Sequence, residues 1–445
     1  MSGRIVVRAG LLIDGNGNAW KNRSVVVKSR SIEGVVESED CHVLPGDEVI
    51  DASAYTVMPG LIDCHVHTRS SGDPKDRGFD STQTSIPTFA YRALLNAHKD
   101  LEAGFTTIRD MASIGYVDIS LRDTFERGDF PGPRMRVVGY GLTQWGGHMH
   151  HFLRPGLDMV ESTGVVNNPA EAQSAARYQI GRGADGIKFN SGVGKLVDGK
   201  IVMEQEMDYD LMAVAVKEAR KVGAWSATHC HGGRGATDAI LAGVTSIEHG
   251  HWLTDEHFDL MLRNGTIFVP TMCPNEKRYE RGKDRTGSGP EFWEWLERET
   301  EDKIDTLARA MKAGVPIAAG SDAGTNYNFH GENAREMEFL VMRGMPPMMA
   351  IVAGTKIAAM TAKLDHKIGT LDAGKWADVI VVNGNPVENI KVLNDKANIL
   401  LIMKDGKVTI ERGPSLRSVV PAEATAAAAS AGSGTGWGAA EGGRV

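Results

Sequence analysis

The chain is poor in cysteine and aromatic residues and has no long apolar run. Of its 445 residues only four are cysteines, Cys41, Cys64, Cys230 and Cys273, and they are dispersed. So few dispersed cysteines do not resemble a disulfide framework, and we expect packed, reduced thiols. No apolar run reaches the roughly 18 residues of a membrane-spanning helix, and residues 1–12 lack the basic start and cleavage site of a secretory signal. These absences predict a cytoplasmic protein with no membrane partner.

The chain also lacks an excess of positive charge. It has 57 acidic and 49 basic residues, which give a formal net charge of −8. A nucleic-acid partner therefore gains no support, because phosphate binding needs clustered Lys and Arg. What is present is a hydrophobic fraction of 42% and 52 glycines, which suit a globular core with many short turns. We expect a small molecule as the partner.

Two β-rich ends enclose a long segment in which strands and helices alternate. Strand-like runs punctuated by glycine and proline occupy residues 5–58, and a similar texture returns between residues 377 and 406. Between the ends, segments with helical periodicity such as Tyr209–Val222 separate short apolar runs. These runs are Leu61–Cys64, Thr106–Arg109, Met135–Val138, Gly186–Phe189, Trp225–Thr228, Thr245–Glu248, Thr266–Val269 and Pro316–Ala319. Eight strands with intervening helices predict an α/β fold, a (β/α)8 TIM-type barrel.

The pattern predicts four segments along the chain. Residues 1–58 and 364–415 are expected to be the two parts of a small β-sandwich domain, with the barrel in residues 59–363 between them. Residues 416–445 are expected to be a disordered tail, because the stretch from about residue 422 is rich in Ala, Gly and Ser and has no apolar periodicity.

The strongest local signal is the first barrel strand and the two histidines at its end. Residues 58–67 read MPGLIDCHVH. Because side chains alternate along a strand, His65 and His67 point the same way. At the C-terminal end of a barrel strand, that direction is into the mouth where active sites lie. Two imidazoles on one rigid strand make a chelating pair for a divalent metal.

This stretch resembles the first-strand motif of the amidohydrolase superfamily, and the resemblance runs from Val6 to Met403. Residues 368–379, IGTLDAGKWADV, look like the family's return into its β-sandwich domain. The strings SIEHG at residues 246–250 and GGH at residues 146–148 are similar to the imidazolonepropionase-like branch. That branch includes Xaa-Pro dipeptidases (prolidases), carboxypeptidase-like enzymes and ochratoxin-type amidases. Since relatives often associate, a homo-oligomer is expected.

The resemblance implies a full set of metal ligands in addition to the first-strand pair. Lys188 matches the fourth-strand lysine that binuclear members carboxylate on its side-chain nitrogen. A carbamate is anionic and can bridge two metals, whereas an ammonium is a poor ligand because ligands must be deprotonated. His229 and His249 match the fifth- and sixth-strand histidines, and Asp322 matches the eighth-strand aspartate. All four follow apolar strands and precede glycine turns, which places them on one rim.

The resemblance also implies a mechanism for cleaving the amide bond of a dipeptide, an N-acyl amino acid or an ochratoxin-like amide. Two divalent metals share the Lys188 carbamate, and a hydroxide that bridges them attacks the carbonyl. Zinc is the default metal for histidine-rich ligation, with cobalt, manganese and iron left open. Asp322 is expected to take the hydroxide proton and pass it to the leaving nitrogen. His148 is expected to touch the substrate carbonyl or its developing oxyanion.

Some assignments stay open on the sequence alone. His231 lies two residues beyond His229 and shares its face, so either can be the fifth-strand ligand. We prefer His229 as the ligand, with His231 contacting substrate. The candidate contacts for a substrate carboxylate are Lys277, Arg278 and Tyr279, or alternatively Arg234, with Arg278 and Tyr279 preferred. Segments 69–88 and 273–289 are expected to be lid loops. The histidines expected to be solvated in loops are His150, His151, His251 and His330.

Three alternative functions compete with a binuclear amide hydrolase. A mononuclear imidazolonepropionase-like cyclic amide hydrolase or deaminase usually carries a glutamate soon after the fifth-strand histidine, and this chain has the run HCHG from His229. A non-catalytic scaffold would have lost ligands, and here all six positions are filled. An esterase or lactonase would use the same site, since the machinery attacks any polarised carbonyl.

Overall fold

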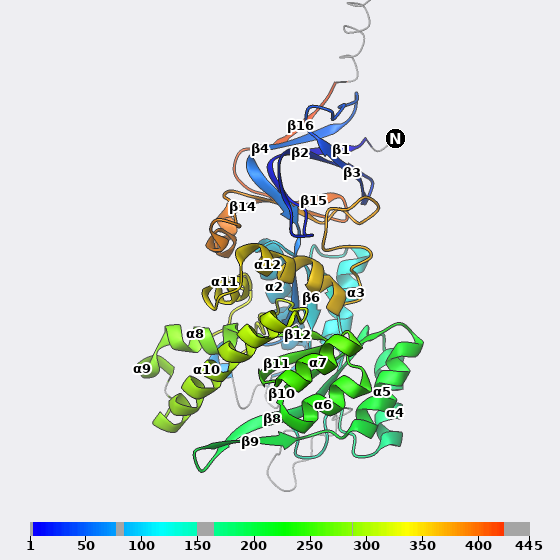
Figure 1. The fold of residues 1–445 in the computed structure, drawn as a ribbon. Helices are drawn as coiled ribbons and strands as arrows, with labels where there is room; N and C mark the ends of the chain where they lie inside the picture. The colour runs from blue at the N-terminus through cyan, green and yellow to red at the C-terminus, as the bar shows by residue number, and fades with distance from the viewer. Residues whose placement is uncertain (1–2, 77–83, 149–163, 287, 422–445) are drawn as a thin grey trace, which may run out of the picture.

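A computed structural model describes residues 3–76, 84–148, 164–286 and 288–421 of the chain. Two kinds of sheet organise it. A terminal sheet lies at one end of the molecule, and parallel strands flanked by helices form the body below it (Figure 1). Within the described ranges, no helix is both long and apolar enough to cross a bilayer.

The terminal sheet is built from both ends of the chain. Its path runs β15-β14-β13-β4-β1-β2-β3, with β16 paired to β4. Its strands are β1 (Ile5–Ile13), β2 (Ala19–Lys28), β3 (Ser31–Glu37), β4 (Glu48–Pro59), β13 (Val379–Val382), β14 (Ile399–Lys404), β15 (Lys407–Glu411) and β16 (Arg417–Val419). β-Branched side chains such as Val7, Val25, Ile50 and Val381 are fully buried on its inner face, as suits strands that pack on one side. The two β-rich ends therefore meet in one sheet.

The parallel strands of the body lie in two sheets. One has the order β5-β6-β7 and the other β12-β11-β10-β8-β9. Their strands are β5 (Leu61–Val66), β6 (Phe105–Asp110), β7 (Arg134–Arg136), β8 (Gly186–Val197), β9 (Lys200–Gln205), β10 (Trp225–Gly232), β11 (Ser246–Trp252) and β12 (Ile267–Val269). All pairs are parallel except β8 with β9, an antiparallel hairpin that the sequence did not predict.

Isolated bridges join the two parallel sheets at both edges. Leu142, beyond β7, bridges Phe189 of β8. At the other edge Ile317 bridges Phe268 of β12, and Ala323 bridges Val66 of β5. The prediction of a strand at Pro316–Ala319 is thus wrong, because the segment makes single bridges and no continuous ladder. It has few backbone hydrogen bonds to neighbouring strands, among them the one that Ala318 N donates to Phe268 O (2.9 Å).

Helices alternate with the parallel strands and cover them on the outside, as α5, α6 and α7 do in Figure 1. Caps define their ends: Asn168 accepts from Glu171 N at the start of α4, and Gly243 ends α6 in the left-handed conformation. The helices are α2 (Ile86–Glu102), α3 (Val117–Arg127), α4 (Pro169–Gly181), α5 (Tyr209–Lys221), α6 (Gly233–Ala242), α7 (Asp255–Asn264), α8 (Cys273–Arg281), α9 (Lys283–Thr286), α10 (Pro290–Ala313), α11 (Arg335–Met342), α12 (Pro347–Val352) and α13 (Ala358–Thr361). Shorter turns are η1 (Pro74–Asp76), η2 (Ala353–Ile357), η3 (Ile390–Asn394) and η4 (Lys396–Asn398).

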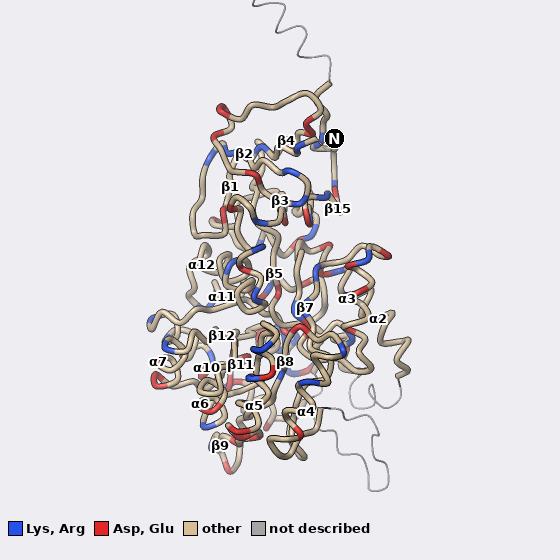
Figure 2. Tube along the Cα trace, turned by 90° about the vertical axis from the view of Figure 1, so that its right-hand side faces the viewer, with Lys and Arg blue, Asp and Glu red and all other residues tan. Residues whose placement is uncertain are grey.

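Two further expectations need correction. Segment 273–289 is not a loop, since it folds into α8 and α9 before α10 begins. Its helix formation follows from Pro274 in the first turn of α8 and from burial of residues 273–277. The tail begins later than predicted, because Arg417–Val419 pairs with β4 as β16; residues 422–445 lie outside the described ranges. Acidic and basic residues are interspersed over the body and the terminal sheet (Figure 2).

Candidate metal centre

Asp63 holds the end of β5 against the segment that closes the body. Its carboxylate accepts hydrogen bonds from the backbone N–H of His65 (3.0 Å), from Ser321 N (2.9 Å) and from Asn333 Nδ2 (2.8 Å). Burial raises the pKa of Asp63 to about 6. These bonds fix the backbone of His65 relative to residues 321–323, which follow the predicted eighth strand.

The ring of His65 is oriented by a buried ionic network. Its Nδ1 lies 2.8 Å from Glu248 Oε2, and Glu248 Oε1 accepts from Arg109 Nη2 at 2.7 Å. Burial opposes ionisation of Glu248, but the Arg109 guanidinium holds its pKa at about 2. An ionised carboxylate only accepts, so Nδ1 carries the proton and Nε2 presents its lone pair. A carboxylate behind a histidine in this way is the usual support of a metal-binding imidazole.

Asp322 faces both histidines of β5. Its Oδ1 lies 3.6 Å from Nε2 of His65 and 3.3 Å from Nε2 of His67, and it makes no well-aligned hydrogen bond. Burial opposes ionisation, but the two neighbouring imidazoles lower the pKa of Asp322. Its backbone is left-handed, with φ of 57°, a conformation that costs energy in a non-glycine residue and is concentrated at functional sites.

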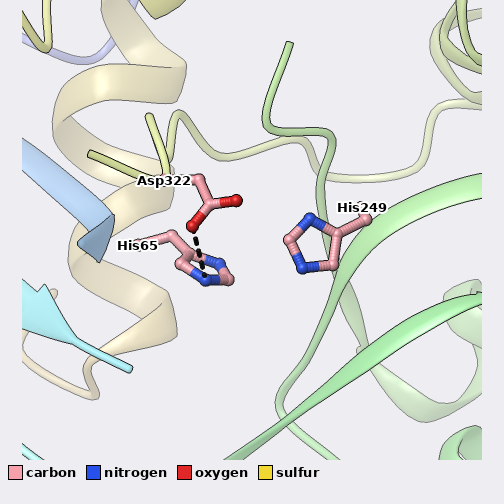
Figure 3. A group of neighbouring side chains, drawn as sticks. All are labelled: His65, His249 and Asp322. Atoms are coloured by element: carbon pink, nitrogen blue, oxygen red, sulfur yellow. Dashed lines mark ion pairs between the residues drawn. The ribbon is translucent and has the colours of Figure 1, made fainter. Parts of the chain in front are cut away.

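His249 completes a group of coordinating atoms with His65 and Asp322. One ligand atom from each of the three lies within 4.8 Å of the others (Figure 3). The Nδ1 of His249 is 2.8 Å from Thr271 Oγ1, and its backbone has φ of 76°. Burial lowers the pKa of His249 well below its usual value. At neutral pH the imidazole is therefore uncharged, the form that binds metal.

His229 lies beside His249 because their strands pair in parallel. In that register His229 is opposite Glu248 and Cys230 is opposite His249. The two imidazole rings are 4.4 Å apart between centroids. The Nε2 of His229 is buried and has no hydrogen-bond partner. A buried ring nitrogen without a partner is costly unless a ligand satisfies it.

Lys188 is buried on β8, next to the strand that carries His229. Only 3% of the residue is exposed, and Ala227 is its partner across the β8–β10 pair. Burial lowers the pKa of Lys188 to about 8. Burial also lowers the pKa of His65, His229 and His249, and the charge of Lys188 adds to each shift. The six predicted ligands thus come from β5 and the residue that follows it, His67, from β8, β10 and β11, and from the turn after Ala319.

His229 and His231 differ in their hydrogen bonds. The Nδ1 of His231 accepts the backbone N–H of Gly194 at 3.1 Å. A neutral imidazole that accepts at Nδ1 carries its proton on Nε2, so His231 is arranged as a hydrogen-bond donor. The Nε2 of His229 is unpaired, and a ligand atom of His231 lies within 4.8 Å of ligand atoms of His251 and Glu299, so both histidines stay candidate ligands.

The His148 ring stacks on His229. Their centroids are 4.2 Å apart and the ring planes differ by 17°. His148 is exposed, and its backbone N–H donates to the Glu206 carboxylate. The ring therefore covers His229 from the open side of the site.

Other predicted positions fall elsewhere. Arg278 lines a separate cavity of about 140 Å³ with Phe292 and Tyr327, and the ring of Tyr279 packs edge-on against Trp293 at 5.8 Å. The histidine cluster does not include either residue.

Two histidines expected in solvent are buried. His251 packs on His231 with ring centroids 4.2 Å apart, and its Nδ1 lies 2.7 Å from a Glu299 carboxylate oxygen. His330 contacts Asp100 (2.8 Å) and the backbone oxygen of His67 (3.1 Å). Both expectations were wrong, because α10 and the turn after Asp322 fold over the rim. His150 and His151 lie outside the described residues.

Sequence reasoning assigned no role to the residues that orient the His65 ligand, namely Asp63, Arg109 and Glu248, or to Glu206, which holds the backbone of His148. One signal was available: Asp63 and Glu248 are acidic residues within otherwise apolar strand runs, where a charge needs a partner.

Known proteins resemble this chain over most of its length. Residues 56–409 match the model of the Amidohydrolase family. Ochratoxinase of Aspergillus niger is 28% identical over 432 residues, covering 92% of this chain and 87% of that protein; its crystal structure superimposes with a TM-score of 0.81 over 94% of this chain and 99% of the other.

Two further relatives fall in the same group. A Xaa-Pro dipeptidase crystallised with methionine in its active site is 34% identical, with a TM-score of 0.82 over 92% of this chain and all of the other. Imidazolonepropionase of Haloarcula marismortui is 23% identical, covering 81% of this chain and 83% of that protein. The chain thus belongs to the amidohydrolase family and is a hydrolase that acts on amide carbon–nitrogen bonds.

Proposed function

We propose that the chain is a binuclear metal-dependent amidohydrolase that cleaves the amide bond of a dipeptide or an N-acyl amino acid. The observation that carries the proposal is the convergence of ligand atoms from His65, His249 and Asp322 within 4.8 Å. The unpaired Nε2 of His229 and the poorly paired Oδ1 of Asp322 support it, because a divalent cation would satisfy both.

The donor set fits two metals. One would be held by His65, His67, Asp322 and a carboxylated Lys188, and the other by the same carbamate with His229 and His249. Bound divalent ions supply Lewis acidity, which polarises a carbonyl and makes water acidic enough to attack at neutral pH. Zinc is the expected metal for these nitrogen and oxygen donors.

The environment of Lys188 supports carboxylation. A neutral amine is the form that reacts with carbon dioxide, forming an N–C bond and releasing a proton. Burial, which brings the pKa of Lys188 to about 8, raises the neutral fraction near physiological pH. A carbamate at Lys188 would bridge two metals, which a mononuclear cyclic amide hydrolase or deaminase does not need.

The side chains divide the remaining work. Asp322 is placed to accept a proton at its carboxylate and return it to the leaving nitrogen. His148 stands over His229 on the open side, where its ring can donate to the substrate carbonyl oxygen as charge develops there. The donor Nε2–H of His231 is suited to a second contact with substrate.

The relatives support the substrate class, since ochratoxinase and Xaa-Pro dipeptidase are named for amide substrates. We further propose that the joined parallel sheets form a (β/α)8 barrel and that the terminal sheet is the β-sandwich domain. A cytoplasmic location and a homo-oligomer remain predictions.

The test removes the bridge. Lys188→Ala should bind fewer than two metals per chain and lose activity, and a short carboxylate in the buffer should restore part of both. Metal is measured by elemental analysis after dialysis, with Lys195→Ala, a surface lysine that is ion-paired with Glu204 on the β8–β9 hairpin, as the control. Two metals per chain in Lys188→Ala would contradict the carbamate bridge.

A further inference from the structure

Glu206 is a buried acid with one unsatisfied oxygen. It follows β9 directly, and only 6% of the residue is exposed. Its carboxylate accepts the backbone N–H of His148, but its Oε2 has no hydrogen-bond partner. A buried carboxylate oxygen without a donor is costly, so the position calls for a ligand that supplies one.

Glu206 lies near β10, the strand that carries His229, and its carboxylate holds the backbone of His148, whose ring stacks on His229. Its backbone N–H donates to Ser191 O at 3.0 Å, and Thr228, which precedes His229, donates to Ser191 Oγ at 2.9 Å. Burial raises the pKa of Cys230 to about 11, and the charge of Glu206 adds to that shift. The carboxylate is thus close to the strand that carries His229, and it holds the backbone of the histidine stacked on that ligand.

Two other buried acids, Glu248 and Glu299, already have partners. Glu248 is paired with Arg109 and His65. Glu299 accepts from Asn275 at 3.0 Å and contacts His251.

Glu206 has no such cation. The nearby base Lys195 is ion-paired with Glu204, and within the described ranges no ion pair joins a Lys or Arg to Glu206. The missing partner of Glu206 is therefore a positive charge that the described part of the protein does not provide.

We propose that Glu206 binds the α-ammonium group of the substrate, so that the enzyme prefers dipeptides with a free N-terminus to N-acyl amino acids. The inference rests on the proposed function. In a dipeptide the ammonium is one carbon away from the scissile carbonyl, and Glu206 holds the residue that is placed to contact that carbonyl. An ammonium offers a positive charge and three donors, whereas an acylated nitrogen is neutral and offers at most one N–H donor.

The ionisation of Glu206 is consistent with this role. Burial raises its pKa to about 7, and the His148 N–H and the more distant charge of Lys195 oppose this shift only in part. A bound ammonium would favour the ionised form.

The test compares one dipeptide with its N-acetyl derivative on the metal-loaded enzyme. Glu206→Gln keeps an acceptor for the His148 N–H but loses the charge. We expect kcat/KM for the free dipeptide to fall at least about tenfold, the scale of one charge-assisted hydrogen bond, with no change for the acetylated compound. Glu294→Gln, an exposed acid in α10, is the matched control and should alter neither.

An equal fall for both compounds, or no fall for either, would overturn the inference, since the first result means that Glu206 only positions His148. If the wild-type enzyme cleaves neither compound, the proposed function fails, and calorimetry then decides on Glu206. Tighter binding of the free dipeptide that Glu206→Gln abolishes would support ammonium recognition, and equal binding of both compounds would refute it.

Discussion

The two sides of the candidate metal centre are held by different means. On the side of β5 (the strand-one side, made of His65, His67 and Asp322), the backbone and the His65 ring are fixed by hydrogen bonds: Asp322 N donates to His65 O at 2.7 Å, and Glu248 orients the His65 ring. On the side of β10 (the strand-five side, made of His229, His231 and His148), the contacts are mainly between rings, and His229 Nε2 has no partner.

This difference indicates that one side is preorganised and the other is completed by what it binds. Ligands with a hydrogen-bonded support keep their geometry without metal. A ring held mostly by stacking depends on its ligand for orientation. We therefore expect substitutions on the strand-one side to remove chemistry or metal affinity, and those on the strand-five side to change substrate selection.

The largest effect is expected from Asp322→Asn. The amide retains an oxygen for metal but cannot accept a proton, so kcat should fall by at least about two orders of magnitude, the scale of general acid–base catalysis, while most bound metal is kept. Steady-state kinetics and elemental analysis on the same sample measure the two quantities. Turnover close to that of the wild type would exclude proton transfer by Asp322.

A smaller effect is expected from substitutions of the residues that contact the ligand histidines from the side away from the metal. Glu248→Gln leaves the shape but removes the charge that orients His65, and metal affinity should fall about 10- to 100-fold. Competition with a chelating dye measures it. Thr271→Val, behind His249, is the comparison: it removes a neutral hydroxyl partner and should weaken affinity less. An equal loss in both variants would show that the ionic network gives the strand-one side no special rigidity.

Sequence reasoning found the ligands because their signals are local. His65 and His67 are two residues apart on one strand, so alternation alone places them on one face. The supports were missed because their partners are remote: Glu248 meets His65 across 183 positions, and Asp63 meets Ser321 across 258. No periodicity encodes such pairs.

The dependence on contacts remote in sequence also explains which parts of the fold the sequence did not predict. Apolar runs separated by segments of helical periodicity located most of the parallel strands, since both are local features. The segment at Pro316–Ala319 was expected to be a strand, yet it makes isolated bridges, because pairing depends on how β5 and β12 approach it. Likewise, helix formation in α8 depends on packing beneath α11, where Glu336 accepts the N–H groups of Met272 and Cys273.

The smallest expected effect concerns the stability of the strand-one side, where further buried carboxylates gather. Asp110 accepts the backbone N–H of Thr68, the residue after His67, at 3.2 Å, and Asp118 accepts that of Gly139 at 2.8 Å. Burial raises the pKa of Asp118 from its usual 3.8 to about 7, and the charge of Asp110 adds to the shift. The native state therefore keeps a proton that the unfolded chain releases near pH 4, so the free energy of unfolding falls as pH rises between these values and levels off above 7.

Asp118→Asn removes this loss, since the amide stays neutral at every pH. Relative to the wild type, the free energy of unfolding of the variant should increase by on the order of 1–2 kcal/mol between about pH 5 and pH 8. Denaturant titrations at each pH measure it, and metal loss with pH cancels in the difference. Asp123→Asn, an exposed acid on the same helix, should follow the wild-type curve. Parallel curves for Asp118→Asn and the wild type would mean that Asp118 is ionised in the native protein. The buried carboxylates that distinguish the strand-one side from the strand-five side would then be Asp63, Asp110 and Glu248 alone.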